Sequence, residues 1–321
     1  MGIFLAITLL SGCGAAARGG HGDTDTSAQE AEVAESSAVP QFDADSAYAY
    51  VKRQVEFGPR VPNTEAHART AVWLASELRR HGAQVVEQKA DLKAFDGTVL
   101  KMTNIMGSYN PQATDRLLLL AHYDTRPWAD RDPDAANHSK PIDGANDGAS
   151  GVAVLLEAAR MLGAAKTDTG IDILFVDAED YGTDGDDDSW AMGARYFAEN
   201  PIKPGYRPSR AILLDMVGDT GASFPAEYMS RQAAPDLDDA FRAAAQRAGF
   251  ADRFPRVMGG AVTDDHVQLI KQGIPAIDII DYRRGTGFCP TWHTLDDNLS
   301  NISRETLRAV GQSLFEFLNA Q

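Results

Sequence analysis

Cysteine is nearly absent from this 321-residue chain, which contains only Cys13 and Cys289. Two cysteines cannot build a disulfide scaffold, so this class of small cross-linked protein is excluded. Hydrophobic residues make up 44% of the sequence, and a chain of this length and composition can bury a substantial core. We therefore expect one folded domain and a tail.

Positive charge is also scarce. The chain has 30 Lys and Arg residues against 46 Asp and Glu residues, and its formal net charge is −16. Such a balance repels phosphate backbones and anionic lipid head groups. We therefore expect no nucleic-acid partner.

Long apolar runs are missing as well: beyond the N-terminal residues, no stretch is long enough to span a membrane, and there is no internal repeat. The N-terminal "MGIFLAITLLSGCGAAARGG" contains a short apolar run that suits the hydrophobic region of a signal peptide. Its Leu-Ser-Gly-Cys resembles the lipobox of bacterial lipoproteins, although no Lys or Arg precedes the run. The resemblance implies a signal peptide over residues 1–12 and lipidation of Cys13. The membrane would then be reached by a lipid anchor only, on the extracytoplasmic side of a bacterial cell envelope. The alternative is a buried terminal strand.

Residues 13–41 predict a disordered tether. The stretch from Gly14 to Pro40 is rich in Ala, Gly, Ser, Thr and acidic residues and has no aromatic residue. It cannot bury enough apolar surface to offset the entropy lost on ordering. The folded domain is therefore predicted over residues 42–321.

Four short apolar runs predict buried strands. They lie at residues 116–124, 171–180, 211–219 and 274–282. Helical patterns at residues 148–162, 235–249 and 303–319 lie between and after them. Apolar strands that alternate with amphipathic helices indicate an α/β sandwich around a largely parallel sheet.

Acidic residues or histidine stand at the end of each predicted strand. They are His122 and Asp124, then Asp177, Glu179 and Asp180, then Asp215 and Asp219, then Asp278 and Asp281. Ligands of open α/β sheets bind beyond the carboxyl ends of the strands. So many carboxylates at one edge would repel one another unless a cation lies among them. With histidine and carboxylates available and no useful cysteine, zinc or a similar divalent ion fits best.

Six short motifs contain most of these residues: "AHYDTRP" (121–127), "GANDGASG" (144–151), "VDAEDYG" (176–182), "LLDMVGD" (213–219), "TDDH" (263–266) and "TWHTLDDN" (291–298). In this order, from about residue 45 to the end, the chain resembles the M28-type zinc exopeptidase superfamily. The stretches "HYDTRPWADRDPDAANHSKPIDGANDGASGVAVLLE" and "DSWAMGARYFAENP" resemble the bacterial glutaminyl-peptide cyclotransferase branch. The resemblance implies an α/β/α sandwich with a central mixed, mostly parallel twisted sheet.

The resemblance also implies roles for individual residues. Asp147, Asp180 and His293 would bind one zinc ion; many relatives have glutamate where Asp180 stands. Glu179 would be the general acid and base, and Asp215 and Asp264 would form hydrogen bonds near the reacting centre. The substrate pocket would include Trp292, Phe288 and His122, with Trp128 or Trp190 as further candidates.

The implied reaction is cyclisation of an N-terminal glutamine in peptides and proteins to pyroglutamate, with release of ammonia. Zinc would polarise the side-chain amide, and Glu179 would move the proton from the attacking amine to the leaving nitrogen. Two alternatives stay open. His122, Asp147 and Asp215 would suffice for a second zinc, which would make the protein a dinuclear aminopeptidase. A protein of this fold that had lost its metal would act only as a binding or receptor ectodomain. Such a loss normally shows as replaced ligands, whereas Asp147, Glu179, Asp180 and His293 can all bind a metal or transfer a proton.

Two further features lie close to these motifs. The run "DGDDD" (184–188) lacks the spacing of a calcium loop and predicts a solvated acidic loop near the site, which would favour peptides with a positively charged N-terminus. Cys289 has no base beside it in sequence, so we expect a structural thiol.

Overall fold

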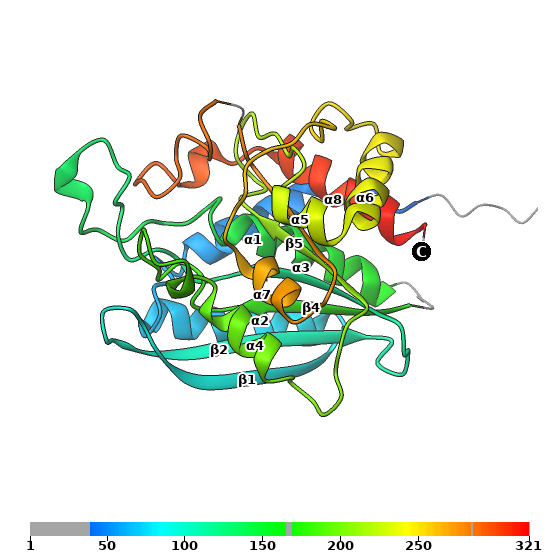
Figure 1. Cartoon of the computed structure of the whole chain (residues 1–321), viewed down its shortest axis with the longest axis horizontal. Coiled ribbons are helices and arrows are strands. Elements are labelled where there is room, and N and C mark those ends of the chain that lie inside the picture. The colour runs from blue at the N-terminus through cyan, green and yellow to red at the C-terminus, as the bar shows by residue number, and fades with distance from the viewer. Residues whose placement is uncertain (1–38, 165–168, 284, 321) are drawn as a thin grey trace, which may run out of the picture. The chain divides into compact units, whose positions relative to one another are not determined.

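A six-stranded sheet is the centre of the computed structural model, which describes residues 39–164, 169–283 and 285–320 (Figure 1). The strands are β1 Gln84–Lys93, β2 Val99–Tyr109, β3 Arg116–His122, β4 Gly170–Val176, β5 Arg210–Asp215 and β6 Ala276–Ile280. Their order across the sheet is β1-β2-β4-β3-β5-β6. Strands β3 to β6 run parallel, whereas β1 pairs with β2 and β2 with β4 in antiparallel fashion. The predicted mixed, mostly parallel sheet is confirmed.

The four strands predicted from apolar runs are β3 to β6, and every residue of β3, β4 and β6 is buried. Strands β1 and β2 were not predicted. β1 has no buried residue, because it forms the edge of the sheet, and its sequence QVVEQKADLK therefore lacks an apolar run. Edge strands that face water do not carry the continuous hydrophobic pattern of a central parallel strand.

Helices cover both faces of the sheet (Figure 1). The helices are α1 Ala44–Val55, α2 Glu65–Arg80, α3 Ala149–Ala164, α4 Met192–Glu199, α5 Tyr228–Ala233, α6 Pro235–Arg247, α7 Asp265–Lys271 and α8 Arg304–Leu318. Short 3₁₀ helices lie at Ala135–Asn137, Asp187–Ser189 and Leu299–Asn301. The main hydrophobic core joins α1, α2, α3, α6 and α8 to one face, and a smaller core joins α4 and α7 to the other. The α/β/α sandwich is confirmed, as are the helices predicted over residues 148–162, 235–249 and 303–319.

Helix α3 packs closely against the sheet, and this contact fixes the position of the preceding loop, which contains Asp147. A Cβ on Gly151 would lie 2.1 Å from the backbone oxygen of Leu214 in β5. Gly148, just before the helix, has φ +97°, and a Cβ there would lie 2.6 Å from the backbone oxygen of Asp124. Glycine is needed at both positions, because a side chain would push Asp147 away from the carboxyl ends of the strands.

The folded part begins close to the predicted boundary. Phe42 is buried and packs over Gly311 of α8, and the Asp43 side chain caps the N-terminus of α1. The predicted signal peptide over residues 1–12 and the lipidation site Cys13 lie outside the described residues, as does almost all of the tether over residues 13–41. In the part of the chain that the structure describes, no helix combines the length and hydrophobicity needed to cross a bilayer.

Candidate active site

Three predicted ligands meet at the carboxyl edge of the sheet. Donor atoms of Asp147, Asp180 and His293 all lie within 4.8 Å of one another, and the three side chains are buried. The Nε2 atom of His293 is 3.1 Å from Asp180 Oδ1 and 3.5 Å from Asp147 Oδ2. Both carboxylate oxygens of Asp180 are buried without a hydrogen-bond partner. Buried carboxylates need a compensating charge, so this nitrogen and oxygen donor set fits a zinc ion.

A second layer orients His293. Its Nδ1 atom is 3.4 Å from Asp130 Oδ1, and Arg126 holds the Asp130 carboxylate through bonds of 2.8 and 2.6 Å. Arg126 also donates to the backbone oxygen of Asp180, so one guanidinium joins two of the ligand segments. Metal-bound histidines usually donate their second ring nitrogen to such a carboxylate. Burial alone would lower the pKa of His293, but Asp180 and Asp130 outweigh it and raise this pKa to about 9.

Two buried aspartates hold the backbone of the other ligands. The Asp124 carboxylate accepts hydrogen bonds from the backbone N–H groups of Glu179 and Asp180, at 3.1 and 3.2 Å. The Asp297 carboxylate accepts bonds from the N–H groups of Asn146 and Asp147, at 2.7 and 3.0 Å. Asp124 was grouped with the strand-end acids expected around a cation, and Asp297 was given no role, so the sequence did not predict that either one holds a backbone turn. Each one positions a turn that presents a candidate ligand.

The backbone is strained at several of these positions. Ala178, Met216 and His293 have φ values of +54°, +47° and +55°, in a region that residues other than glycine rarely adopt. Ala178 precedes Glu179, and Met216 follows Asp215. Strain of this kind persists only where the surrounding contacts hold it, and it concentrates at functional sites.

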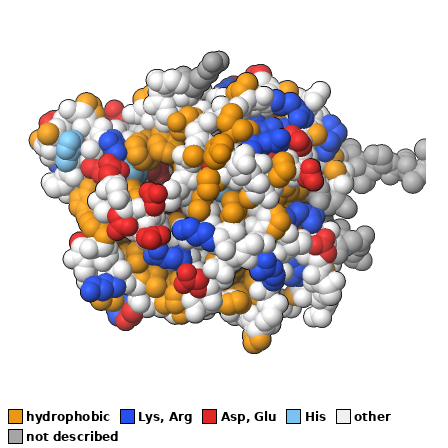
Figure 2. Space-filling model, in the orientation of Figure 1, with side chains coloured by type: hydrophobic (Ala, Val, Ile, Leu, Met, Phe, Trp, Pro, Cys, Tyr) orange, Lys and Arg blue, Asp and Glu red, His pale blue; other side chains and the backbone are white. Residues whose placement is uncertain are grey.

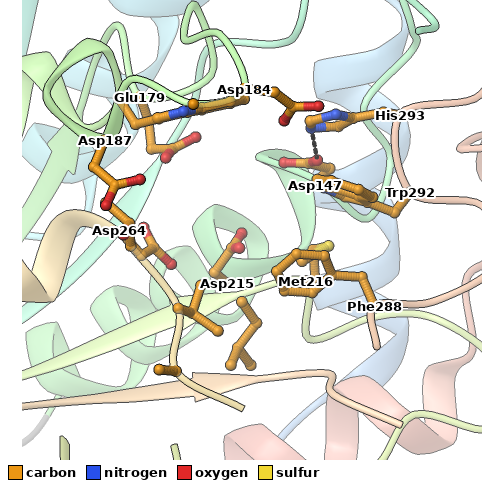
Figure 3. Close-up of a pocket in the computed structure, with 16 residues that line it drawn as sticks. Asp147, Glu179, Asp184, Asp187, Asp215, Met216, Asp264, Phe288, Trp292 and His293 are labelled. Atoms are coloured by element: carbon orange, nitrogen blue, oxygen red, sulfur yellow. Dashed lines mark ion pairs between the residues drawn. The ribbon is translucent and has the colours of Figure 1, made fainter. Parts of the chain in front are cut away.

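A cavity of about 230 Å³ opens beside the three ligands. Glu179, Asp215, Asp264, Phe288 and Trp292 all line it, as predicted from the sequence. In Figure 3 the Glu179 carboxylate points into the cavity from the side opposite His293. The cavity therefore places a carboxylate that can move a proton across from the group that would hold a metal.

The acidic groups in this cavity titrate abnormally. Burial raises the pKa of Glu179 well above its usual range, and the Asp264 carboxylate raises it further while His122 opposes the shift. Burial also raises the pKa of Asp264 to about 7, with Asp215 as the next cause. A carboxyl group with a raised pKa can both take and return a proton near neutral pH.

Phe288 and Trp292 form an apolar wall of the cavity next to His293. The Phe288 and Trp292 rings have centroids 4.6 Å apart, and Trp292 stacks on His293 at 3.9 Å. Trp190 also lines the cavity. Trp128 does not, and instead packs against Phe95 and Tyr181. Of the two additional tryptophans considered, the structure places Trp190 at the cavity.

The prediction that His122 belongs to the substrate pocket needs correction, because this residue does not line the cavity. It is 1% exposed and lies behind the ligands, where its Nε2 atom is 3.1 Å from both Asp147 Oδ1 and Asp215 Oδ1. The donors of these three residues also lie within 4.8 Å of one another. The second donor group that the sequence left open is therefore present.

Three of the acids at strand ends are not part of this site. Asp177 accepts from His67 and from the Tyr123 hydroxyl, and Asp219 and Asp281 both pair with Arg283. Each carboxylate has its own local partner, so convergence on one metal was wrong for these residues. Sequence spacing could not show this for Asp177 and Asp219, because their partners His67 and Arg283 come from other segments of the chain.

Cys289 is buried, and burial raises the pKa of its thiol to about 12. A thiol with so high a pKa is a poor nucleophile. The predicted acidic loop does reach the site, since Asp184 and Asp187 line the cavity.

A buried cluster adjoins the cavity behind Asp264. His266 Nε2 donates to the Glu227 carboxylate at 3.1 Å, and its Nδ1 atom is 3.8 Å from Asp278 Oδ2. Both oxygens of Asp278 are buried without a hydrogen-bond partner, and burial and Asp264 raise its pKa well above the usual range. Asp278 was grouped with the strand-end acids, but it lies within β6 and faces this cluster.

The sequence matches known proteins over most of the described domain. The model of the family described as "Peptidase family M28" matches residues 104–318. The chain belongs to peptidase family M28. Membership of this family suggests a zinc ion, and the donor group of Asp147, Asp180 and His293 is one that could hold it.

Solved structures of other proteins are similar to this chain over nearly their whole length. A glutaminyl cyclase of Bacteroides thetaiotaomicron is 49% identical, with a TM-score of 0.87 over 88% of this chain and 99% of that chain. A leucine aminopeptidase precursor of the same organism is 49% identical, with a TM-score of 0.86 over the same shares. The glutaminyl-peptide cyclotransferase of Bos taurus is 25% identical over 248 residues, which are 67% of this chain and 65% of that protein. The chain thus spans about two thirds of this relative. The resemblance predicted from the motifs is confirmed.

Proposed function

We propose that this protein is a glutaminyl-peptide cyclotransferase, which converts N-terminal glutamine of peptides and proteins to pyroglutamate and releases ammonia. One observation carries the proposal: Glu179, a buried carboxyl with a raised pKa, points into a cavity opposite the candidate ligand His293. The near full-length similarity to a solved bacterial glutaminyl cyclase supports it.

The reaction joins the α-amine nitrogen of the first residue to its own side-chain amide carbon. The bond from that carbon to the amide nitrogen then breaks, and ammonia leaves. We assign one zinc ion to Asp147, Asp180 and His293; when bound, it would polarise the amide carbonyl and stabilise negative charge on its oxygen.

The side chains of the protein perform the remaining tasks. Glu179 takes a proton from the attacking amine and returns it to the departing nitrogen, so no net proton is exchanged in the ring closure. Asp215 and Asp264 line the same cavity and accept hydrogen bonds from the amine. Phe288 and Trp292 form an apolar wall that orients the glutamine side chain and limits access of water.

The test is an assay on glutaminyl-naphthylamide with zinc-loaded protein, following ammonia and free naphthylamine separately. Ammonia without naphthylamine, lost in Glu179→Gln while the variant keeps its zinc, is the expected result. Release of naphthylamine would refute the proposal, because it requires hydrolysis of the bond that a cyclase leaves intact.

A dinuclear aminopeptidase is the second candidate, and His122 is the observation that favours it. Its Nε2 atom is equally close to Asp147 and Asp215, and these three donors would accept a second zinc ion. Zinc counted per chain separates the candidates. One ion supports the cyclase and gives His122 the role of a hydrogen-bond donor behind the ligands; two ions with free naphthylamine indicate the aminopeptidase.

We also propose that Cys13 carries lipid and holds the enzyme on the extracytoplasmic side of a bacterial membrane. The support is the Leu-Ser-Gly-Cys sequence after a short apolar run. Fractionation of cells that express the full chain tests this: the protein should sediment with membranes and become soluble in Cys13→Ser. Equal distribution of the two proteins would refute the anchor.

A further inference from the structure

The acidic loop between β4 and α4 reaches the mouth of the cavity. Its residues 184–188 read Asp-Gly-Asp-Asp-Asp, and Asp184, Gly185 and Asp187 line the cavity. The cyclisation chemistry proposed above uses none of them. All three are exposed parts of the cavity lining.

The four aspartates of this loop differ in their partners. Asp184 pairs with Arg131 at 2.6 Å, and Asp186 accepts from the backbone N–H of Asp188. Asp188 lies off the cavity, 4.0 Å from Arg195 and 3.6 Å from Lys271.

Asp187 is different, because among the described residues its carboxylate has neither an ion pair nor a hydrogen bond. It is exposed, and in Figure 3 it points into the cavity beside Glu179 and Asp264. Asp187 therefore carries the one negative charge of the loop that no described neighbour offsets.

The cavity is lined by six acidic side chains and by no Lys or Arg. Deeper in the same wall, Asp264 is 3% exposed and its Oδ2 atom has no hydrogen-bond partner. A buried oxygen of this kind needs a donor from a water molecule, an ion or a ligand. Figure 2 shows acidic side chains gathered around a hollow on the left of the face in view.

The buried acids and the exposed Asp187 would contact different parts of a bound peptide. The deep acids lie beside the candidate ligands, where the α-amine of the first residue must react. Asp187 is an exposed part of the cavity lining, which the side chain of the next residue would reach. A lysine or arginine there would place its cation against a carboxylate that lacks a partner.

We propose that Asp187 is a specificity-determining residue that selects peptides with Lys or Arg directly after the N-terminal glutamine. This inference rests on the proposed cyclase function. An exposed ion pair contributes modestly, so the expected preference for Lys over Ala at that position is about threefold in kcat/KM. The preference should lie in KM, because the cation does not take part in ring closure.

The experiment uses the full zinc-loaded protein and three peptides that differ only after the glutamine: Gln-Lys, Gln-Ala and Gln-Glu, each followed by the same neutral residues. Ammonia release is measured for the wild type, for Asp187→Asn and for Asp188→Asn. The last variant is the matched control, because it removes the same charge from the same loop but off the cavity.

We expect the wild type to rank the peptides Lys, then Ala, then Glu. Asp187→Asn should bring the Lys to Ala ratio close to one, and Asp188→Asn should keep the wild-type ratio. Because the pair is exposed, 0.5 M NaCl should also remove most of the preference.

Equal kcat/KM for the three peptides in the wild type would overturn the proposal, and so would equal effects of the two variants. Both results leave cyclisation intact. Absence of ammonia from Gln-Ala with every protein would instead refute the cyclase function itself.

Discussion

Asp124 provides the sharpest test of how this fold builds its active site. Its carboxylate is fully buried and accepts the backbone N–H groups of Glu179 and Asp180. In Asp124→Asn the amide oxygen can keep one of these bonds, but the amide N–H₂ group faces the other donor. One hydrogen bond to a charged group is lost, which costs about 1.5–3 kcal/mol, and the other becomes a weaker neutral bond.

The expected loss of unfolding free energy is therefore about 3 kcal/mol. In urea, with an m value of about 3 kcal/mol/M, the midpoint of zinc-free protein should fall by about 1 M. The strained turn at Ala178, with φ +54°, loses the contact that holds it, so Glu179 and Asp180 should move from their positions. We expect about tenfold to hundredfold weaker zinc binding and a comparable loss in kcat.

Asp172→Asn is the control for general destabilisation. Asp172 is also fully buried and accepts two bonds of 2.7 Å from Arg116, but it lies near the start of β4, at the end of the strand away from the site. Removing this charge should lower stability by about 3 kcal/mol or more while zinc affinity and kcat of the folded protein stay at wild-type values. If Asp124→Asn keeps its zinc affinity and kcat, or if the two variants lose them equally, the positioning role of Asp124 is refuted.

Three further outcomes follow from the site and its supports. The pKa of His293 in the metal-free protein is about 9, so the imidazole must lose a proton when zinc binds. Zinc affinity should therefore rise by about tenfold per pH unit between about pH 6 and 8. Competition with a chelator measures the affinity, and a flat pH profile would contradict the prediction. Arg126→Lys loses the two-bond contact with Asp130, so zinc binding should weaken by about tenfold. Because Arg126 is buried and also donates to the backbone oxygens of Asp180 and Gly182, the urea midpoint of the metal-free protein should fall as well. Unchanged zinc affinity would show that Asp130 orients His293 unaided. Gly151→Ala places a Cβ 2.1 Å from the backbone oxygen of Leu214, so the melting temperature should fall by several degrees, and an unchanged value would mean that α3 moves freely.

The central strands and the longer helices could be predicted from the sequence because their patterns are local. A strand buried on both faces, such as β3 with RLLLLAH, needs a continuous apolar run. The edge strand β1 carries no such pattern, because its pairing with β2 comes from the backbone and its side chains face water. The edge of the sheet was therefore decided by tertiary pairing.

The same division holds for the site. The strand-end pattern predicted that carboxylates and histidine gather at one edge of the sheet, because parallel strands bring their carboxyl ends together there. The choice of Asp147, Glu179, Asp180 and His293 came from the resemblance of their motifs to the M28-type superfamily. Only the structure showed that Asp177 belongs to His67 instead, since the two are 110 residues apart in the chain.

By itself, the sequence determined the kind of chemistry. It supplied carboxylates and histidine at the ends of buried strands, and too few cysteines for a disulfide scaffold or a set of thiolate ligands. The tertiary structure decided which acid serves which purpose. Asp124 and Asp297 hold ligand turns, and Asp187 alone in its loop has no described partner. The physical reason is that the role of a carboxylate depends on its burial and on the charges within a few ångströms, and residues distant in sequence supply those charges.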